Sequence, residues 1–136
     1  MIDHLGLDVG DYRRSRDFYA AALEPLGYGV KTELPAEPSG VPDRAGFGPS
    51  HPVFWIAGGG AVEKPLHFAF SATNRAQVDA FYRAALGAGG RDNGAPGLRP
   101  HYHPNYYAAF VFDPDGHNIE AVCHAPGSPA DQTVNF

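Results

Sequence analysis

The sequence carries one motif twice, and this repeat restricts the possible fold more than any other feature. One copy spans residues 4–27 and the other residues 67–90, and they align without a gap at an offset of 63, the difference between His4 and His67. The coinciding positions include a histidine, an aromatic pair and a glycine: His4 with His67, Phe18-Tyr19 with Phe81-Tyr82, and Gly27 with Gly90. We therefore expect two copies of one structural unit.

Each copy is predicted to begin with a short strand that leads into a helix. Residues 2–9 and 66–72 alternate between apolar and polar positions, which is typical of strands with one packed face. In the helices that follow, apolar residues recur at i, i+3, i+4 and i+7, with Asp11 and Asn74 as predicted N-caps. Further strands are expected at residues 28–34, 45–47, 51–57, 107–112 and 118–123, and a loop at residues 93–105.

This order predicts an α+β fold made of two repeated βαβββ units. We expect cupped mixed sheets around a concave cleft, with the helices on the outside. The units would span residues 1–60 and 64–125 of a single domain, 1–125, followed by a C-terminal tail, 126–136. The polar strand faces would line the cleft, and His4, His67 and Glu120 would then point into it.

Charge and cysteine content exclude several classes of partner. The formal net charge is −5 and no run of Lys or Arg is present, which argues against nucleic acid and anionic membranes. The lone cysteine, Cys123, excludes an internal disulfide and fits a reducing compartment. With no apolar stretch near ~18 residues and no charged leader, we expect a cytoplasmic protein.

A second group of chemically useful side chains precedes the strand at residues 107–112. It comprises His101, Tyr102, His103, Tyr106 and Tyr107. A histidine there could act as an acid or base near neutral pH, and a tyrosine could orient a substrate oxygen. His103 and Tyr102 are the catalytic candidates, and Tyr106 and Tyr107 the substrate-binding candidates. The alternative is a solvated loop with aromatic anchors.

Three other residues have structural or substrate-binding interpretations. Trp55 is either a cleft wall that stacks on a flat substrate or a core residue, and we favour the wall. His117 lies in the predicted hairpin turn, directly after residues 113–116, and is expected to be exposed to solvent. Cys123 alternates with apolar residues toward the helix side, which indicates a small core residue and not a nucleophile.

The arrangement resembles the vicinal oxygen chelate superfamily. That superfamily includes glyoxalases, fosfomycin-modifying thiol transferases, extradiol dioxygenases and bleomycin-binding resistance proteins. The resemblance covers residues 1–125 and rests on "IDHLGLDV", "LHFAF" and "FVFDPDGHNIEAV". It implies a divalent metal held by His4, His67 and Glu120, with Fe, Mn, Zn or Ni as the ion. It also implies a small-molecule substrate with vicinal oxygens, and a homodimer.

The sequence departs from two patterns of the family. Aligning "PVFWIA" with "HNIEAV" places Trp55 where metal-dependent glyoxalases have a fourth ligand, and indole cannot ligate a metal. The two histidines and one carboxylate that remain suit Fe(II), Mn(II) or Zn(II). Phe110, a candidate substrate contact, occupies the slot where extradiol enzymes have a tyrosine, and phenylalanine cannot hydrogen-bond a catecholate.

We therefore expect a metal-dependent enzyme of the lyase, isomerase or transferase type. One alternative is a metal-free protein that binds a small molecule or confers resistance. A second alternative is an Fe(II) dioxygenase of the extradiol type.

Overall fold

The computed structural model describes residues 2–127, and its elements follow the order that the repeat predicts. The first unit contains β1 (Leu5–Asp8), α1 (Tyr12–Leu23), a 3₁₀ turn η1 (Glu24–Leu26), β2 (Gly29–Leu34), β3 (Arg44–Gly48) and β4 (Phe54–Ala57). The second contains β5 (His67–Ser71), α2 (Arg75–Gly87), β6 (Arg91–Leu98), β7 (Tyr107–Phe112) and β8 (Asn118–Cys123). Most of the predicted tail, residues 128–136, lies outside the described part.

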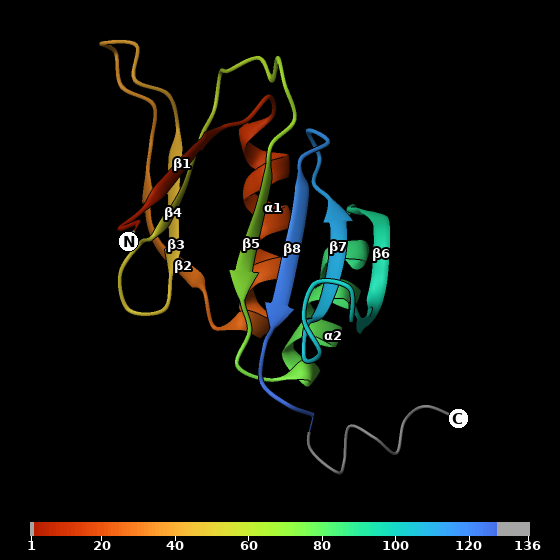
Figure 1. Ribbon diagram of the computed structural model, residues 1–136. Helices are drawn as coiled ribbons and strands as arrows, with labels where there is room; N and C mark the ends of the chain where they lie inside the picture. Colours follow the sequence, from red (N-terminus) through yellow and green to blue (C-terminus); the bar gives the residue numbers. More distant parts are fainter. Residues whose placement is uncertain (1, 128–136) are drawn as a thin grey trace.

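The strands form two four-stranded mixed sheets, one in each unit (Figure 1). The strand orders are β1-β4-β3-β2 and β5-β8-β7-β6. In each sheet the first and last strands of the unit pair in parallel, and the other pairs are antiparallel. The predicted α+β fold with two βαβββ units is confirmed.

Side-chain caps begin both helices as the sequence predicts. Asp11 accepts a hydrogen bond from the Arg14 amide at 3.1 Å, and Asn74 accepts one from the Gln77 amide at 2.9 Å. Each cap satisfies one of the amides that a helix start leaves without an intrahelical partner. The first helix tightens into η1, and Gly27 ends it with a φ of 80°, a conformation that glycine adopts without steric cost.

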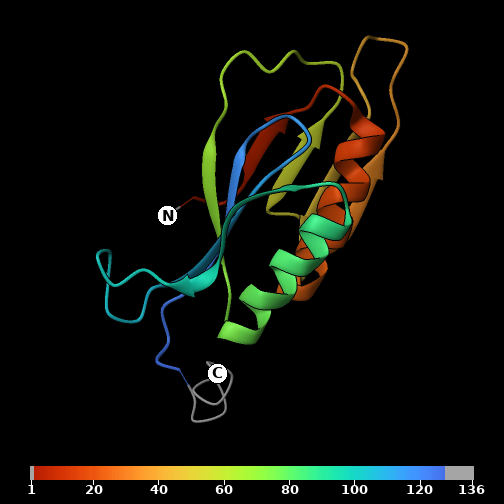
Figure 2. The same ribbon diagram turned by 90° about the vertical axis from the view of Figure 1, so that its right-hand side faces the viewer.

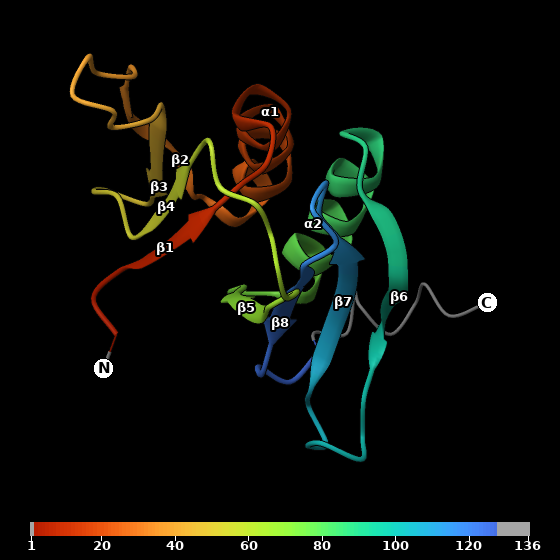
Figure 3. The same cartoon turned by 90° about the horizontal axis from the view of Figure 1, so that it is seen from above.

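One hydrophobic core joins the two units. The helices pack side by side, each with one face on its own sheet (Figures 2 and 3). Phe54 of β4 contacts Phe70 of β5 edge-on, with ring centroids 5.3 Å apart. Because the same cluster contains buried residues of both helices and both sheets, neither unit has a separate core. None of the helices in the described chain has the length and apolar character needed to cross a bilayer.

Strand β6 corrects the prediction of a loop over residues 93–105. The loop occupies only residues 99–106, because the chain between Arg91 and Leu98 pairs with β7. Its sequence has two glycines and a proline, and the pairing register shifts on both sides of Gly94. Such bulges are tolerated at the edge of a sheet. β4 likewise begins at Phe54 and not at residue 51.

The turn between β7 and β8 connects the second unit to the first. The buried carboxylate of Asp113 accepts a hydrogen bond from the Tyr19 hydroxyl of α1 at 2.5 Å. Asp115 accepts one from the Gly10 amide at 3.2 Å. The prediction that His117 is exposed is wrong: it is 1% exposed, and its Nδ1 accepts a hydrogen bond from the Leu66 amide at 2.8 Å. The turn packs inward because it contacts the first unit.

Candidate functional site

The open face of the second sheet forms a depression in which two of the predicted ligands meet. We call it the second-unit depression; its volume is about 430 Å³, and it is lined by His67, Tyr102, Tyr106, Phe110, Asn118 and Glu120. Nε2 of His67 lies 3.2 Å from Oε1 of Glu120. The His67 side chain is 50% exposed, whereas that of Glu120 is 2% exposed, so the carboxylate forms the floor and the imidazole the rim.

Hydrogen bonds fix both side chains. Nδ1 of His67 lies 2.9 Å from the carbonyl oxygen of Asn118, which can only accept a hydrogen bond. When the ring is neutral, Nδ1 therefore carries its proton, and Nε2, the nitrogen that faces Glu120, has the free lone pair. The other oxygen of Glu120 accepts a hydrogen bond from the Tyr106 hydroxyl. Burial, together with this bond to Glu120, raises the pKa of Tyr106 to about 12, so the phenol remains a donor.

The remaining members of the predicted aromatic group do not all reach the second-unit depression. Tyr102 lines it, and Phe110 lies across the strand pair from Glu120. Tyr107 instead donates to Asp79 of α2 at 2.7 Å, because strand alternation turns it to the helix face. The exposed loop carries the two predicted histidines: His103 stacks edge-on with His124, and His101 contacts Tyr102.

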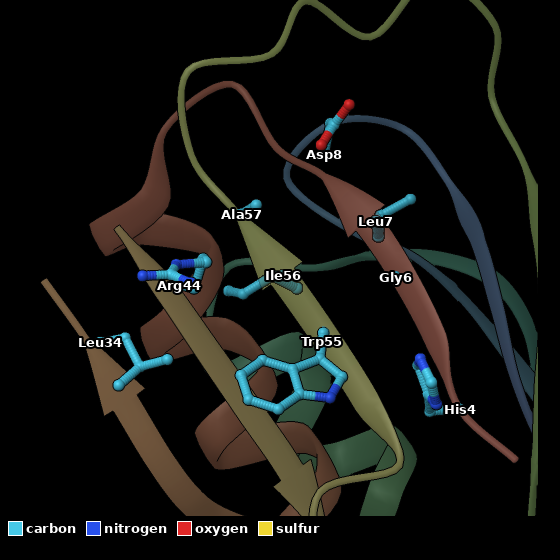
Figure 4. Close-up of a pocket in the computed structure, with 9 residues that line it drawn as sticks. All are labelled: His4, Gly6, Leu7, Asp8, Leu34, Arg44, Trp55, Ile56 and Ala57. Atoms are coloured by element: carbon cyan, nitrogen blue, oxygen red, sulfur yellow. The ribbon is translucent and has the colours of Figure 1, made fainter. Parts of the chain in front are cut away.

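The open face of the first sheet forms a second, larger hollow of about 600 Å³, the first-unit depression. It contains His4, Gly6, Asp8, Leu34, Arg44 and Trp55. Trp55 lies across the sheet between Leu34 and Arg44 on one side and His4 on the other (Figure 4). Trp55 is half-buried and lines the depression, so its place is that of a wall residue and not of a core residue.

His4 does not join His67 and Glu120 within one chain. It lies immediately before β1 and contacts Asp3, with 2.7 Å between its Nδ1 and the carboxylate. β1 and β5 belong to different sheets, and His4 is not among the residues that line the second-unit depression with His67 and Glu120. One chain alone does not bring the three predicted ligands together, and the three-ligand set stays a prediction.

A different group in residues 2–127 has its ligand atoms within 4.8 Å of one another, and it consists of Asp113, Asp115 and His117. Its spacing alone would allow a metal. However, the Leu66 amide donates to Nδ1 of His117, which places the ring proton on the buried, unpaired Nε2. A ring in this tautomer has no free lone pair, so the hydrogen bonds favour a brace between the units.

The strand registers show that Trp55 and Glu120 are equivalent positions. Trp55 pairs with Gly6 in the first parallel pair, and Glu120 pairs with Ala69 in the second. Gly6 and Ala69 differ by the same offset of 63 that relates the two copies. The alignment that set Trp55 in the fourth-ligand slot is therefore correct for the backbone.

Three contributors to these depressions were not identified from the sequence. The Tyr106–Glu120 hydrogen bond crosses from a loop, and no periodicity predicts it. The carbonyl of Asn118 reaches His67 because the parallel pairing sets these two residues side by side, which the repeat could have indicated. Arg44 begins a short strand in a Pro- and Gly-rich stretch, where no pattern marked it.

Comparisons with known proteins agree with this architecture. The model of the Glyoxalase/Bleomycin resistance protein/Dioxygenase superfamily matches residues 1–121. A glyoxalase/bleomycin resistance protein from Albidiferax ferrireducens is 28% identical with a TM-score of 0.75, over 89% of this chain and 97% of that one. Among curated proteins, none matches the chain significantly.

Two further solved structures share the fold at lower identity. A glyoxylase/bleomycin resistance protein/dioxygenase domain from Frankia is 15% identical with a TM-score of 0.71, over 97% of each chain. A glyoxalase I mutant from Zea mays is 24% identical with a TM-score of 0.69, over 89% of this chain and 46% of that one. The repeat, the sheet topology and the family match together lead to one conclusion: this chain belongs to the Glyoxalase/Bleomycin resistance protein/Dioxygenase superfamily.

Proposed function

We propose that the protein is a divalent-metal-dependent enzyme of the lyase, isomerase or transferase type. Its substrate would be a small molecule with vicinal oxygens. His67 and Glu120 of the second-unit depression would hold the metal, together with His4. The observation that carries the proposal is the 3.2 Å approach of His67 Nε2 to Glu120 Oε1, together with the contact of Nδ1 to the Asn118 carbonyl, which leaves Nε2 as the ligating nitrogen of a neutral ring.

The pair fits a metal in its spacing and in the tautomer that its hydrogen bond selects. Two ligand atoms that each lie about 2.1 Å from one ion at a right angle are about 3 Å apart. The bond to the Asn118 carbonyl selects the tautomer in which Nε2 can ligate. A nitrogen-and-carboxylate set of this kind is compatible with Fe, Mn, Zn or Ni.

The side chains around the pair have distinct tasks in this proposal. A bound ion would polarise the substrate oxygens as a Lewis acid. Tyr106 holds Glu120 in place by donating to its second oxygen. Phe110 and Tyr102 flank the substrate, and the Tyr102 hydroxyl can orient one of its oxygens. A proton-transfer role for His103 stays a prediction, since its ring lies on the exposed loop.

We also propose that His4 reaches this site from a second copy of the chain. His4 lies in the first-unit depression, away from His67 and Glu120 of its own chain. Its side chain is 61% exposed, and β1 is the edge strand of its sheet. A homodimer that sets the first unit of one copy against the second unit of the other would bring the three ligands together.

Metal binding is tested with protein purified without a metal-affinity tag. Added Fe(II), Mn(II), Zn(II) or Ni(II) should raise the melting temperature, because an ion that binds only the folded state stabilises it. The gain is about 2.7 kcal/mol at a free metal concentration about 100 times Kd. His67→Ala should abolish the shift, and the exposed His51, which lies outside the predicted ligand set and forms a hydrogen bond with Ser50, supplies the control His51→Ala.

The arrangement of ligands is tested by mixing two defective variants. His4→Ala and Glu120→Gln each remove one ligand from every site, but a mixed dimer regains one complete site. Metal content that recovers only on mixing would support the shared site, and a monomer by light scattering would contradict it. If the wild type shows no melting shift with any of the ions, the metal-free binding protein becomes the better assignment.

A further inference from the structure

We infer that the first-unit depression binds a planar carboxylate, with Arg44 on the carboxylate and Trp55 on the flat part. If the proposed function is correct, this ligand is the substrate; the catalytic interpretation therefore rests on the proposed function. The inference itself concerns only the first sheet. It can therefore be tested without a metal.

The depression exists because small residues surround two large ones on the open face. In one row across the sheet, Trp55 has Gly6 on one neighbouring strand and Gly46 on the other. A side chain at Gly46 would approach the indole to 3.2 Å, so the ring lies over that glycine. A Cβ at Gly6 would meet nothing within 4 Å, which leaves open space beside the indole.

The next row places a cation beside the indole. Arg44 pairs with Leu34 on one side and with Ala57 on the other, and Asp8 follows beyond Ala57. The row therefore has a guanidinium near one end and a carboxylate at the other, with only a methyl group between them. An anionic group is attracted to the Arg44 end, and a hydrogen-bond donor to the Asp8 end.

Hydrogen bonds orient the guanidinium of Arg44 but do not use all of its donors. Its Nε donates to the Pro42 carbonyl at 3.2 Å, and its Nη2 donates to Glu37 Oε1 at 3.1 Å. In the described part of the chain, Nη1 has no hydrogen-bond partner. The Glu37 side chain is 52% exposed, and an ion pair of this kind contributes little to stability. A ligand carboxylate that binds the fork with two oxygens can displace it.

Arginine beside an exposed aromatic face selects the class of ligand. Indole offers a flat apolar surface that stacks on a conjugated ring or planar acid. Guanidinium recognises carboxylate by its planar, forked geometry. The volume, about 600 Å³, lies in the range of small-molecule sites. Together these features point to a planar monocarboxylate.

The test uses benzoate and its neutral isostere benzamide on the full chain in the presence of a chelator. Trp55 is the only tryptophan, so its emission reports on this depression alone, and calorimetry gives the affinities. Benzoate should bind about tenfold more tightly than benzamide, which is typical of a charge-assisted hydrogen bond. Arg44→Gln should remove this preference, and Glu37→Gln should strengthen benzoate binding a few-fold by freeing the fork.

Two controls make the result specific. Gly6→Val fills the open space and should weaken the binding of both probes. Arg83→Gln, at an exposed position of α2, changes the net charge by the same amount as Arg44→Gln and should leave the affinity for both probes unchanged. The benzoate preference should persist in His67→Ala, which separates this inference from the metal proposal. Equal affinities for the two probes, no binding of either, or a preference that survives Arg44→Gln would overturn it. So would unchanged benzoate affinity in Glu37→Gln, a variant on an exposed loop that leaves the core intact.

Discussion

The hydrogen bond from Tyr19 to Asp113 should be a principal link between the two units. The tyrosine is fully buried on α1 and the aspartate is 3% exposed in the β7–β8 turn, 94 residues further along the chain. Tyr19→Phe removes one oxygen and leaves the ring contacts with Phe18 and Phe54 in place. The variant therefore isolates the hydrogen bond from the packing.

The expected loss follows from what Asp113 retains. Its Oδ1 still accepts from the amides of Asp115 and His117, at 2.9 and 2.8 Å, but Oδ2 loses its only donor in the described structure. Hydrogen bonds to charged groups contribute about 1.5–3 kcal/mol. We expect Tyr19→Phe to lower the free energy of unfolding by about 2 kcal/mol, which corresponds to about 6 °C in melting temperature for a domain of this size.

Urea unfolding followed by circular dichroism measures this loss, with an unchanged m-value as the sign of an unchanged unfolded state. Tyr28→Phe is the matched control, since Tyr28 contacts Phe70 by its ring and its hydroxyl has no bond within residues 2–127. A loss below about 0.5 kcal/mol for Tyr19→Phe, or an equal loss for Tyr28→Phe, would refute the reasoning.

The pH dependence gives an independent check on the same residue. Burial, and then the charge of Asp113, raises the pKa of Tyr19 well above its ordinary value. The unfolded chain ionises this phenol near pH 10 while the folded chain keeps it protonated. Its contribution is therefore constant below about pH 10 and falls as the pH rises further. The stability gap between wild type and Tyr19→Phe should narrow above that pH.

Three other measurements test the packing and the site. Gly90→Ala should destabilise by about 1–3 kcal/mol in urea unfolding because its Cβ would lie 2.6 Å from Val111, whereas Gly87→Ala, with nothing within 4 Å, should stabilise by about 0.5 kcal/mol. Trp55→Glu should enlarge the metal-induced rise in melting temperature, and an unchanged rise would mean that residue 55 does not face the metal. Fe(II)-loaded protein should take up little oxygen with catechol or 2,3-dihydroxybiphenyl, because Phe110 offers no hydrogen bond; robust uptake that needs Glu120 would favour the dioxygenase alternative.

Local patterns were sufficient for most of the fold. β7 and β8 have the bounds that alternation predicts, and Asp11 and Asn74 cap their helices. β6 was missed because an exposed edge strand with bulges has neither alternation nor strong strand formers. Its pairing is fixed by β7 across the sheet, which is information that a local window of sequence does not contain.

The site was less accessible to sequence reasoning, for a related reason. Spacing placed His67 and Glu120 on one open face, and the structure brings them together. Spacing could not show that His4 lies outside this group, since the angle between the sheets depends on how the two helices pack. His117 was misplaced because turn residues are usually solvated, and here the turn packs on the first unit.

In the proposed site the two units would have different roles, because equivalent strand positions differ in bulk and charge. In the first unit the ligand slot holds Trp55, and glycine lies beside it on β3. In the second unit the slot holds Glu120, and the aromatic residue, Phe110, lies on the neighbouring strand. A site built from like units would have two carboxylates or none. The proposed homodimer, which sets the first unit of one copy against the second unit of the other, would give each site one carboxylate for a metal and one indole wall for a substrate.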